Sequence, residues 1–297
     1  MKSKAKKFIS LIVTLVMAFT IMSMTMMSMP AGAANNKTYS SIQKYSVEYG
    51  GQTYSGYILI PDDCAGKKYD VVLVYCGLGG LVRWDQYNFQ NWLSKWVDNG
   101  YIKPCIFVSP SVIDNGKDMA AGIGSSASEY NMFERNVRKQ MGNFKEALLK
   151  TQYGKYIDAR KNISVGGYSM GACASIYAGT LYPNLYPNIA SLSPSFPYFC
   201  DDGSGWIKTK KEVVFSKSSR AKRLLSIGKC ETEPFLSSFQ RYEVTARNNG
   251  YRFKTYVSKK DGHNVNLFYR EIFVFMYYLD HNTVLTDAQL EIMDYKA

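Results

Sequence analysis

Histidine is nearly absent from this sequence, which contains only His263 and His281 among its 297 residues. There is no C-x-x-C motif and no cluster of histidine and cysteine, so the sequence predicts neither a metal site nor a cofactor. The G-x-x-x-x-G-K-[ST] phosphate loop is absent as well. A general base of the histidine type therefore has two candidates.

Acidic residues are fewer than basic ones, and the formal net charge is +12. No arginine-rich helix and no aromatic RNA-binding signature accompanies this charge, so the sequence argues against a nucleic-acid partner. A basic surface would favour an anionic polysaccharide or cell wall, or it would serve solubility alone. The sequence leaves both interpretations open.

Long apolar runs are absent except near the N-terminus. Four lysines within the first seven residues precede an uncharged run over residues 8–22, and Ala31-Gly32-Ala33 follows it. This order predicts a secretory signal peptide, residues 1–33, that is cleaved after Ala33. The alternative is an uncleaved membrane anchor, because the uncharged stretch continues to Met29. Cleavage would leave residues 34–297 with a net charge of about +8.

Six cysteines follow the signal segment, an even number that permits disulfides in a secreted chain. They are Cys64, Cys76, Cys105, Cys173, Cys200 and Cys230. Three lie in or beside predicted apolar elements, where a free thiol packs like a small apolar side chain. Cys200 and Cys230 lie in predicted loops and could pair.

Strand-like apolar runs alternate with helical segments after a predicted hairpin over residues 44–49 and 52–60. The further predicted strands cover residues 69–75, 105–109, 162–168, 189–193, 223–227 and 253–257, and the predicted helices cover residues 85–99, 131–151, 169–181, 234–248 and 265–279, with a short one from residue 287. The first four of these strands are almost continuously apolar, as in a parallel sheet covered on both faces. The sequence thus predicts one α/β domain with a mostly parallel, doubly wound sheet and an N-terminal antiparallel hairpin.

A serine, Ser169, lies within a G-x-S-x-G motif at residues 167–171, between a predicted strand and a predicted helix. That context is typical of a nucleophile elbow, which exposes the hydroxyl at the carboxyl edge of a parallel sheet. A serine hydroxyl needs a neighbouring base, and His263 is the candidate because it follows the last predicted strand. His281 follows a predicted helix and fits a position at its C-terminal end.

The histidine in turn needs a carboxylate that orients its ring and stabilises its charged form. Glu231 and Glu233 follow the predicted strand 223–227, and Glu231 is preferred because it lies nearer to the strand end. Asp201 and Asp202 are weaker competitors.

Backbone N–H groups that could stabilise an oxyanion occur at two places. One is Met170, directly after the serine, and the other is Leu78, with Gly79 as its alternative, in the glycine-rich loop after the strand 69–75. An ordinary strand-to-helix turn is the other interpretation of that loop.

Three segments together resemble the putative esterase family of α/β-hydrolases, which includes feruloyl and acetylxylan esterases, S-formylglutathione hydrolase and the mycolyltransferases. They are residues 92–110, the motif at residues 166–171, and Gly262-His263-Asn264 before the last long helix. The resemblance implies the α/β-hydrolase fold and a Ser-His-acid triad.

The sequence departs from the pattern of that family at three positions. Cys76 stands where the family usually has a histidine, Ala172 where a second glycine is usual, and Glu231 where an aspartate is usual. The change at Cys76 bears on the shape of the oxyanion loop.

Aromatic residues at the predicted carboxyl edge of the sheet could stack on sugar or feruloyl rings, or could be structural. They are Trp84, Tyr87 and Trp206. The favoured hypothesis is a secreted serine esterase that removes acetyl or feruloyl groups from plant or cell-wall polysaccharide, or acts on a small acyl ester. The alternatives are an acyltransferase of the same family and a catalytically silent glycan-binding protein. The signal peptide argues against S-formylglutathione hydrolase, which is cytoplasmic in that family.

Overall fold

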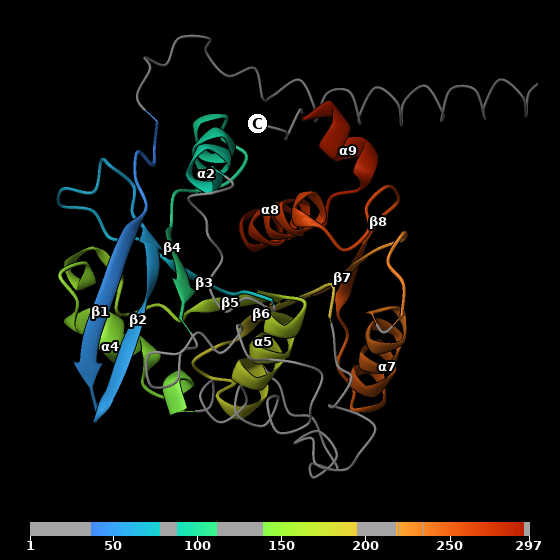
Figure 1. Cartoon of the computed structure of the whole chain (residues 1–297), viewed down its shortest axis with the longest axis horizontal. Helices are drawn as coiled ribbons and strands as arrows, with labels where there is room; N and C mark the ends of the chain where they lie inside the picture. The colour runs from blue at the N-terminus through green and yellow to red at the C-terminus, as the bar shows by residue number, and fades with distance from the viewer. Residues whose placement is uncertain are drawn as a thin grey trace, which may run out of the picture. The chain divides into compact units, whose positions relative to one another are not determined.

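The computed structural model describes residues 37–77, 88–111, 139–194, 218, 220–233 and 235–293. All of them belong to one compact unit, Lys37–Ala297. Eight strands of the described residues form a single sheet in the order β1-β2-β4-β3-β5-β6-β7-β8 (Figure 1). The strands are β1 (Gln43–Tyr49), β2 (Gln52–Leu59), β3 (Val71–Tyr75), β4 (Ile106–Pro110), β5 (Ser164–Tyr168), β6 (Asn188–Leu192), β7 (Arg223–Gly228) and β8 (Lys254–Ser258).

The first two strands form the predicted antiparallel hairpin. Gly50 and Gly51 adopt φ of 59° and 76°, a left-handed turn that suits glycine and joins the strands with two residues. β2 is antiparallel to β4, whereas every pairing from β4 through β3, β5, β6 and β7 to β8 is parallel. The predicted fold class, a mostly parallel sheet with an N-terminal antiparallel hairpin, is confirmed.

Helices cover both faces of the sheet (Figure 1). They are α2 (Phe89–Asp98), α4 (Phe144–Lys150), α5 (Met170–Leu181), α7 (Phe235–Asn248), α8 (Val265–His281) and α9 (Asp287–Ile292), with a 3-10 turn η1 (Gly154–Tyr156). Helices α4, α5 and α7 pack on one face and α2, α8 and α9 on the other.

Alternate residues of the parallel strands supply the two cores. Leu73 and Val165 belong to the cluster that includes α4 and α5, whereas Val72 and Val74 belong to the cluster that includes α2 and α8. Strands β3 and β4 are buried along their whole length because both of their faces are covered. This explains the continuously apolar runs in the sequence.

One predicted helix differs from the structure. The run expected over residues 131–151 is helical at 139–141, turns at 142–143 and begins again as α4, while residues 131–138 lie outside the described part. Gly142 is a weak helix former, and a Cβ there would lie 3.0 Å from the Tyr182 hydroxyl. Asn143, the residue before α4, has φ −115° rather than a helical value. The hydrophobic periodicity continues across this break, which is why the pattern hides it.

The carboxyl ends of the parallel strands carry the residues that the sequence singles out. Ser169 follows β5, Glu231 follows β7 and His263 follows β8. In an open α/β sheet this edge is where ligands bind.

Candidate active site

Ser169 lies in a strained turn between β5 and α5. Its φ is 57° and its ψ is −120°, a conformation that non-glycine residues rarely adopt. Its backbone N–H donates to the carbonyl of Leu192 at 2.9 Å. A Cβ on Gly167 would lie 1.9 Å from the carbonyl oxygen of Gly171, so the turn has room only for glycine there. The sharp turn is therefore the elbow that the motif predicts.

The end of β3 lies directly against this turn. A Cβ on Gly77 would lie 3.0 Å from the Ser169 Cβ and 3.5 Å from its Oγ. Met170 is the first residue of α5, and the N–H groups of a first helical turn have no partner within the helix. Leu78 and Gly79, the other expected donors, lie outside the described residues. The described geometry thus brings the start of the glycine-rich loop to the serine.

Cys76 precedes that glycine. Its thiol is buried and lies 3.1 Å from the Ser109 hydroxyl of β4, one strand away in the sheet. A contact between two small side chains therefore stands at the position where the family that the sequence resembles usually has a histidine.

His263 and Glu231 are held together by a short hydrogen bond. The Nδ1 atom of His263 lies 2.6 Å from Glu231 Oε1, and the Glu231 side chain is fully buried. The turn after β7 fixes the carboxylate, because the Glu231 N–H donates to the carbonyl of Gly228 at 3.1 Å. With Nδ1 engaged, Nε2 is the ring nitrogen left for chemistry.

The imidazole of His263 is also stacked between two aromatic rings. The Tyr168 ring lies 4.7 Å away at 16° and the Phe235 ring 3.8 Å away at 18°. Two parallel rings at these separations cannot share one face, so one lies on each side of the imidazole. Tyr168 directly precedes Ser169, and its hydroxyl donates to the Asn264 carbonyl at 3.3 Å. These contacts bring the histidine to the elbow.

Sequence reasoning missed both ring partners. Tyr168 is the variable residue before the serine of G-x-S-x-G, and Phe235 opens the helix that follows the acid. Their positions beside two functional residues were the available signal, but no local pattern predicts that their rings meet at His263.

The competing residues have other partners. The Oε2 atom of Glu233 accepts a hydrogen bond from the Ser237 N–H in the first turn of α7 at 3.2 Å. His281 is the last residue of α8, about 25 Å along the helix axis from the start of that helix, which follows His263. Its Nε2 lies 2.9 Å from the carbonyl oxygen of Tyr101, and its ring stacks on Tyr277. Neither residue joins the His263–Glu231 pair.

Asn264 explains part of the Gly-His-Asn motif. Its side chain accepts a hydrogen bond from the Leu267 N–H at 3.0 Å and caps α8. The cap fixes the start of the helix directly after His263.

Other expected residues lie outside the described part of the chain. These are the aromatic candidates Trp84, Tyr87 and Trp206, the weaker acids Asp201 and Asp202, Cys200, and the signal segment 1–33. Cys230, the suggested partner of Cys200, is exposed and carries a free thiol. Within the described ranges, no group of three or more metal-ligating side chains comes together and no helix is long and apolar enough to cross a bilayer.

Solved structures with the same architecture are numerous. A CE1 ferulic acid esterase from the anaerobic fungus Anaeromyces mucronatus superposes with a TM-score of 0.65 at 17% identity, covering 84% of this chain and 95% of that one. The feruloyl esterase module from Clostridium thermocellum, solved with sinapinate as a Ser-to-Ala mutant, gives 0.54 at 16% identity, covering 85% and 94%. The BES protein from Bacillus cereus gives 0.53 at 15% identity, covering 85% and 100%. At these identities the likeness shows the fold.

A comparison with curated proteins finds no match. Residues 47–266 match a family model described as "Putative esterase", a span that includes Ser169, Glu231 and His263. The family and the fold together support a carboxylic-ester hydrolase. This chain belongs to the putative esterase family and has the α/β-hydrolase fold.

Proposed function

We propose that this protein is a serine esterase that works through an acyl-enzyme on Ser169. The observation that carries the proposal is the 2.6 Å contact between His263 Nδ1 and buried Glu231, on an imidazole stacked against the residue before the strained serine. A base oriented by a buried carboxylate next to an elbow serine is the arrangement that acyl transfer requires.

In the first half-reaction the Ser169 Oγ attacks the carbonyl carbon of the ester and its proton moves to His263 Nε2. Glu231 stabilises the imidazolium that forms. The negative oxygen of the tetrahedral intermediate accepts hydrogen bonds from the N–H groups of Met170 and Leu78, each contributing on the order of 3 kcal/mol to lowering the barrier. His263 then gives the proton to the departing alcohol, the C–O bond breaks, and an acyl-serine remains.

In the second half-reaction water replaces the alcohol. His263 takes a proton from the water, whose oxygen attacks the acyl carbon, and the same N–H groups stabilise the second oxyanion. Collapse of that intermediate returns the proton to Ser169 Oγ and releases the carboxylic acid. No metal or cofactor takes part in this scheme.

The proposed substrates are acetyl or feruloyl esters of plant or cell-wall polysaccharide, or a small acyl ester. One observation supports this choice, the names of the ferulic acid esterases that share the fold. The expectation of a signal peptide cleaved after Ala33, which would place the enzyme outside the cell, agrees with it. Trp84, Tyr87 and Trp206 remain the proposed substrate-stacking residues.

Labelling with a fluorophosphonate probe tests the proposal, because the probe reacts only with an activated serine. We expect the wild-type protein to label and Ser169→Ala and His263→Ala not to label. A panel of acetylxylan, methyl ferulate and short-chain aryl esters, each with and without a sugar acceptor, then separates hydrolysis from acyl transfer.

A folded wild-type protein that neither labels nor turns over any ester would refute the proposal. The departure at Cys76, beside the oxyanion loop, would then favour the silent glycan-binding protein. A direct test of that alternative is whether the wild-type protein that fails to react with the probe binds acetylxylan.

A further inference from the structure

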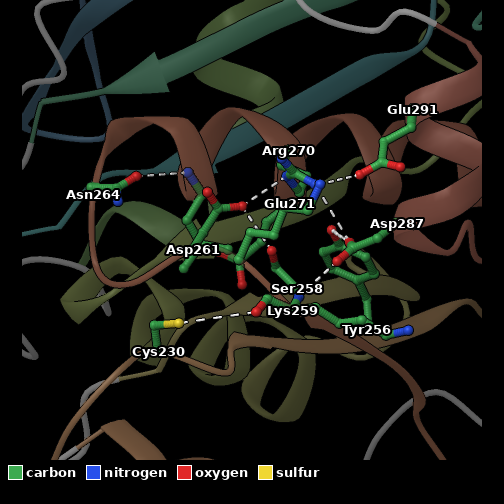
Figure 2. Close-up of polar contacts among 12 residues, drawn as sticks. Cys230, Tyr256, Ser258, Lys259, Asp261, Asn264, Arg270, Glu271, Asp287 and Glu291 are labelled. Atoms are coloured by element: carbon green, nitrogen blue, oxygen red, sulfur yellow. Dashed lines mark hydrogen bonds and ion pairs between the residues drawn. The ribbon is translucent and has the colours of Figure 1, made fainter.

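A buried ion network lies beside the loop that carries His263 (Figure 2). Its centre is Arg270 of α8, whose side chain is only 5% exposed. The Nε atom of Arg270 lies 2.9 Å from Asp261 Oδ2, and Nη1 lies 3.5 Å from Asp287 Oδ1. One guanidinium thus joins the β8–α8 loop to the first residue of α9.

Both carboxylates, Asp287 of α9 and Asp261 within the loop, also accept hydrogen bonds that fix the loop. Asp287 accepts hydrogen bonds from the Tyr256 hydroxyl and from the Lys259 N–H, both at 2.7 Å. Asp261 accepts one from the Ser258 hydroxyl at 2.7 Å. The loop that begins after β8 is therefore anchored before and after Lys260, and His263 follows two residues after Asp261.

The same loop is attached to the segment that carries Glu231. The N–H of Cys230 donates to the carbonyl of Asp261 at 3.1 Å, and a Cβ on Gly228 would lie 2.3 Å from that same oxygen. Asp261 thus contacts Arg270 through its side chain and the acid-bearing turn through its backbone. A shift of Asp261 would move His263 relative to Glu231.

Burying these charges contributes little net stability, because desolvation offsets much of their attraction. The directional contacts of this network are the hydrogen bonds that the two carboxylates accept from Tyr256, Lys259 and Ser258, and Arg270 adds ionic attraction to both carboxylates. Together these contacts favour one geometry of the loop. A displacement of about 1 Å in a catalytic group can cost about a hundredfold in rate, so fixing the loop matters for chemistry.

We propose that Arg270, Asp261 and Asp287 are positioning residues that hold His263 in register with Glu231, and that α9 belongs to the active-site apparatus through Asp287. This inference rests on the proposed function, in which His263 is the base. The capping box at Thr286 and Gln289 fixes the start of α9 and thereby the place of Asp287.

The test compares two acidic residues of α9 in the full chain. Asp287→Ala removes the buried anchor. Glu291→Gln is the matched control, because Glu291 contacts Lys260 of the same loop from the solvent side and both side chains are more than half exposed. We measure the rate of fluorophosphonate labelling and, by NMR, the downfield proton resonance of the His263–Glu231 hydrogen bond. Loss of that resonance in Glu231→Gln assigns it. Circular dichroism establishes that each variant is folded.

We expect Asp287→Ala to label about 10- to 100-fold more slowly than wild type, with loss or broadening of the resonance in a folded protein. Glu291→Gln should stay within about twofold. Labelling of Asp287→Ala within twofold of wild type, with the resonance intact, would overturn the inference.

Further variants keep the two proposals separable. If Asp287→Ala fails to fold, Tyr256→Phe removes a single hydrogen bond to Asp287, and an unchanged labelling rate and resonance in that variant overturn the inference. If the wild type shows the resonance but never labels, the esterase proposal fails while loss of the resonance in Asp287→Ala still supports the positioning role. Absence of both signals from the wild type overturns both proposals.

Discussion

Glu231 and Glu233 are two residues apart, yet their side chains have different tasks. Glu231 is buried against His263, whereas Glu233 accepts a hydrogen bond at the start of α7. We expect Glu231→Gln to lower kcat/KM about 10³- to 10⁴-fold. The neutral amide does not stabilise the positive charge of the imidazolium, and it does not hold the ring in the orientation that the carboxylate imposes. Glu233→Gln, which keeps an acceptor oxygen, should stay within about threefold. Steady-state hydrolysis of an aryl ester measures both, and equal losses would contradict the assignment of Glu231.

Glu271 of α8 is a carboxyl group in the core that has no part in the proposed reaction. It is fully buried, Ser193 donates to its Oε1 at 2.9 Å, and Oε2 has no hydrogen-bond partner among the described residues. Burial raises the pKa of Glu271 well above its usual value, and the nearby Glu231 carboxylate raises it further. The folded protein therefore keeps this proton at a pH where the unfolded chain has lost it.

The sign of the resulting pH dependence follows from this difference. The protonated Glu271 makes its full contribution to the unfolding free energy below the pKa of the unfolded chain, about 4.3. As the pH rises from there towards the pKa of the folded protein, the unfolding free energy falls by up to about 1.4 kcal/mol per pH unit. Glu271→Gln removes this loss, so its unfolding free energy relative to wild type should increase from pH 5 to pH 8. Urea unfolding at both pH values measures it, with the partly exposed Glu243→Gln, in a surface ion pair with Arg247, as control. A constant difference would show that folding does not raise the pKa of Glu271 above its value in the unfolded chain.

At the scale of elements, α5 packs closely against β3 because Gly171 has no side chain. A Cβ on Gly171 would lie 2.3 Å from the Tyr75 carbonyl oxygen and 2.4 Å from that of Cys76. Gly171→Ala must therefore push α5 away from the strand that leads into the oxyanion loop. We expect a loss of 1–3 kcal/mol in unfolding free energy, of the order typical for overpacking, and a labelling rate reduced more than tenfold. Thermal unfolding and labelling measure the two effects, and a wild-type melting temperature would contradict the close packing.

The central strands β3 and β4 were predictable from sequence because burial on both faces makes them apolar. Each predicted strand lies within two residues of an observed one. The helix break at residues 142–143 was not predictable, because the buried residues Met141, Phe144 and Leu148 continue the helical periodicity across it. In the same way the pattern indicates Ser169 and His263 as candidates. It cannot predict that Phe235 stacks on the imidazole or that Asp287 reaches the loop, since those contacts form only after folding.

For the whole molecule, cleavage after Ala33 is the expectation that follows from the order of charged, uncharged and small residues at the N-terminus. Cleavage there would leave the hairpin, the sheet and both cores intact, because the first strand begins at Gln43. We expect the protein from the culture medium of an expressing bacterial host to begin at Ala34, as measured by N-terminal sequencing and intact mass. Recovery of the full-length chain in the membrane fraction would favour the uncleaved anchor instead.

The position of Asp287 also bears on the order in which the protein is made. The sheet is complete in sequence at Ser258, and His263 follows it, but the anchor of their connecting loop is translated only afterwards. Because a domain generally folds as a unit, the histidine loop can reach its anchored form only once residues near Asp287 are available. With Asp287 as an anchor, hydrolytic competence would therefore require almost the whole chain, whether it folds at the ribosome or after export.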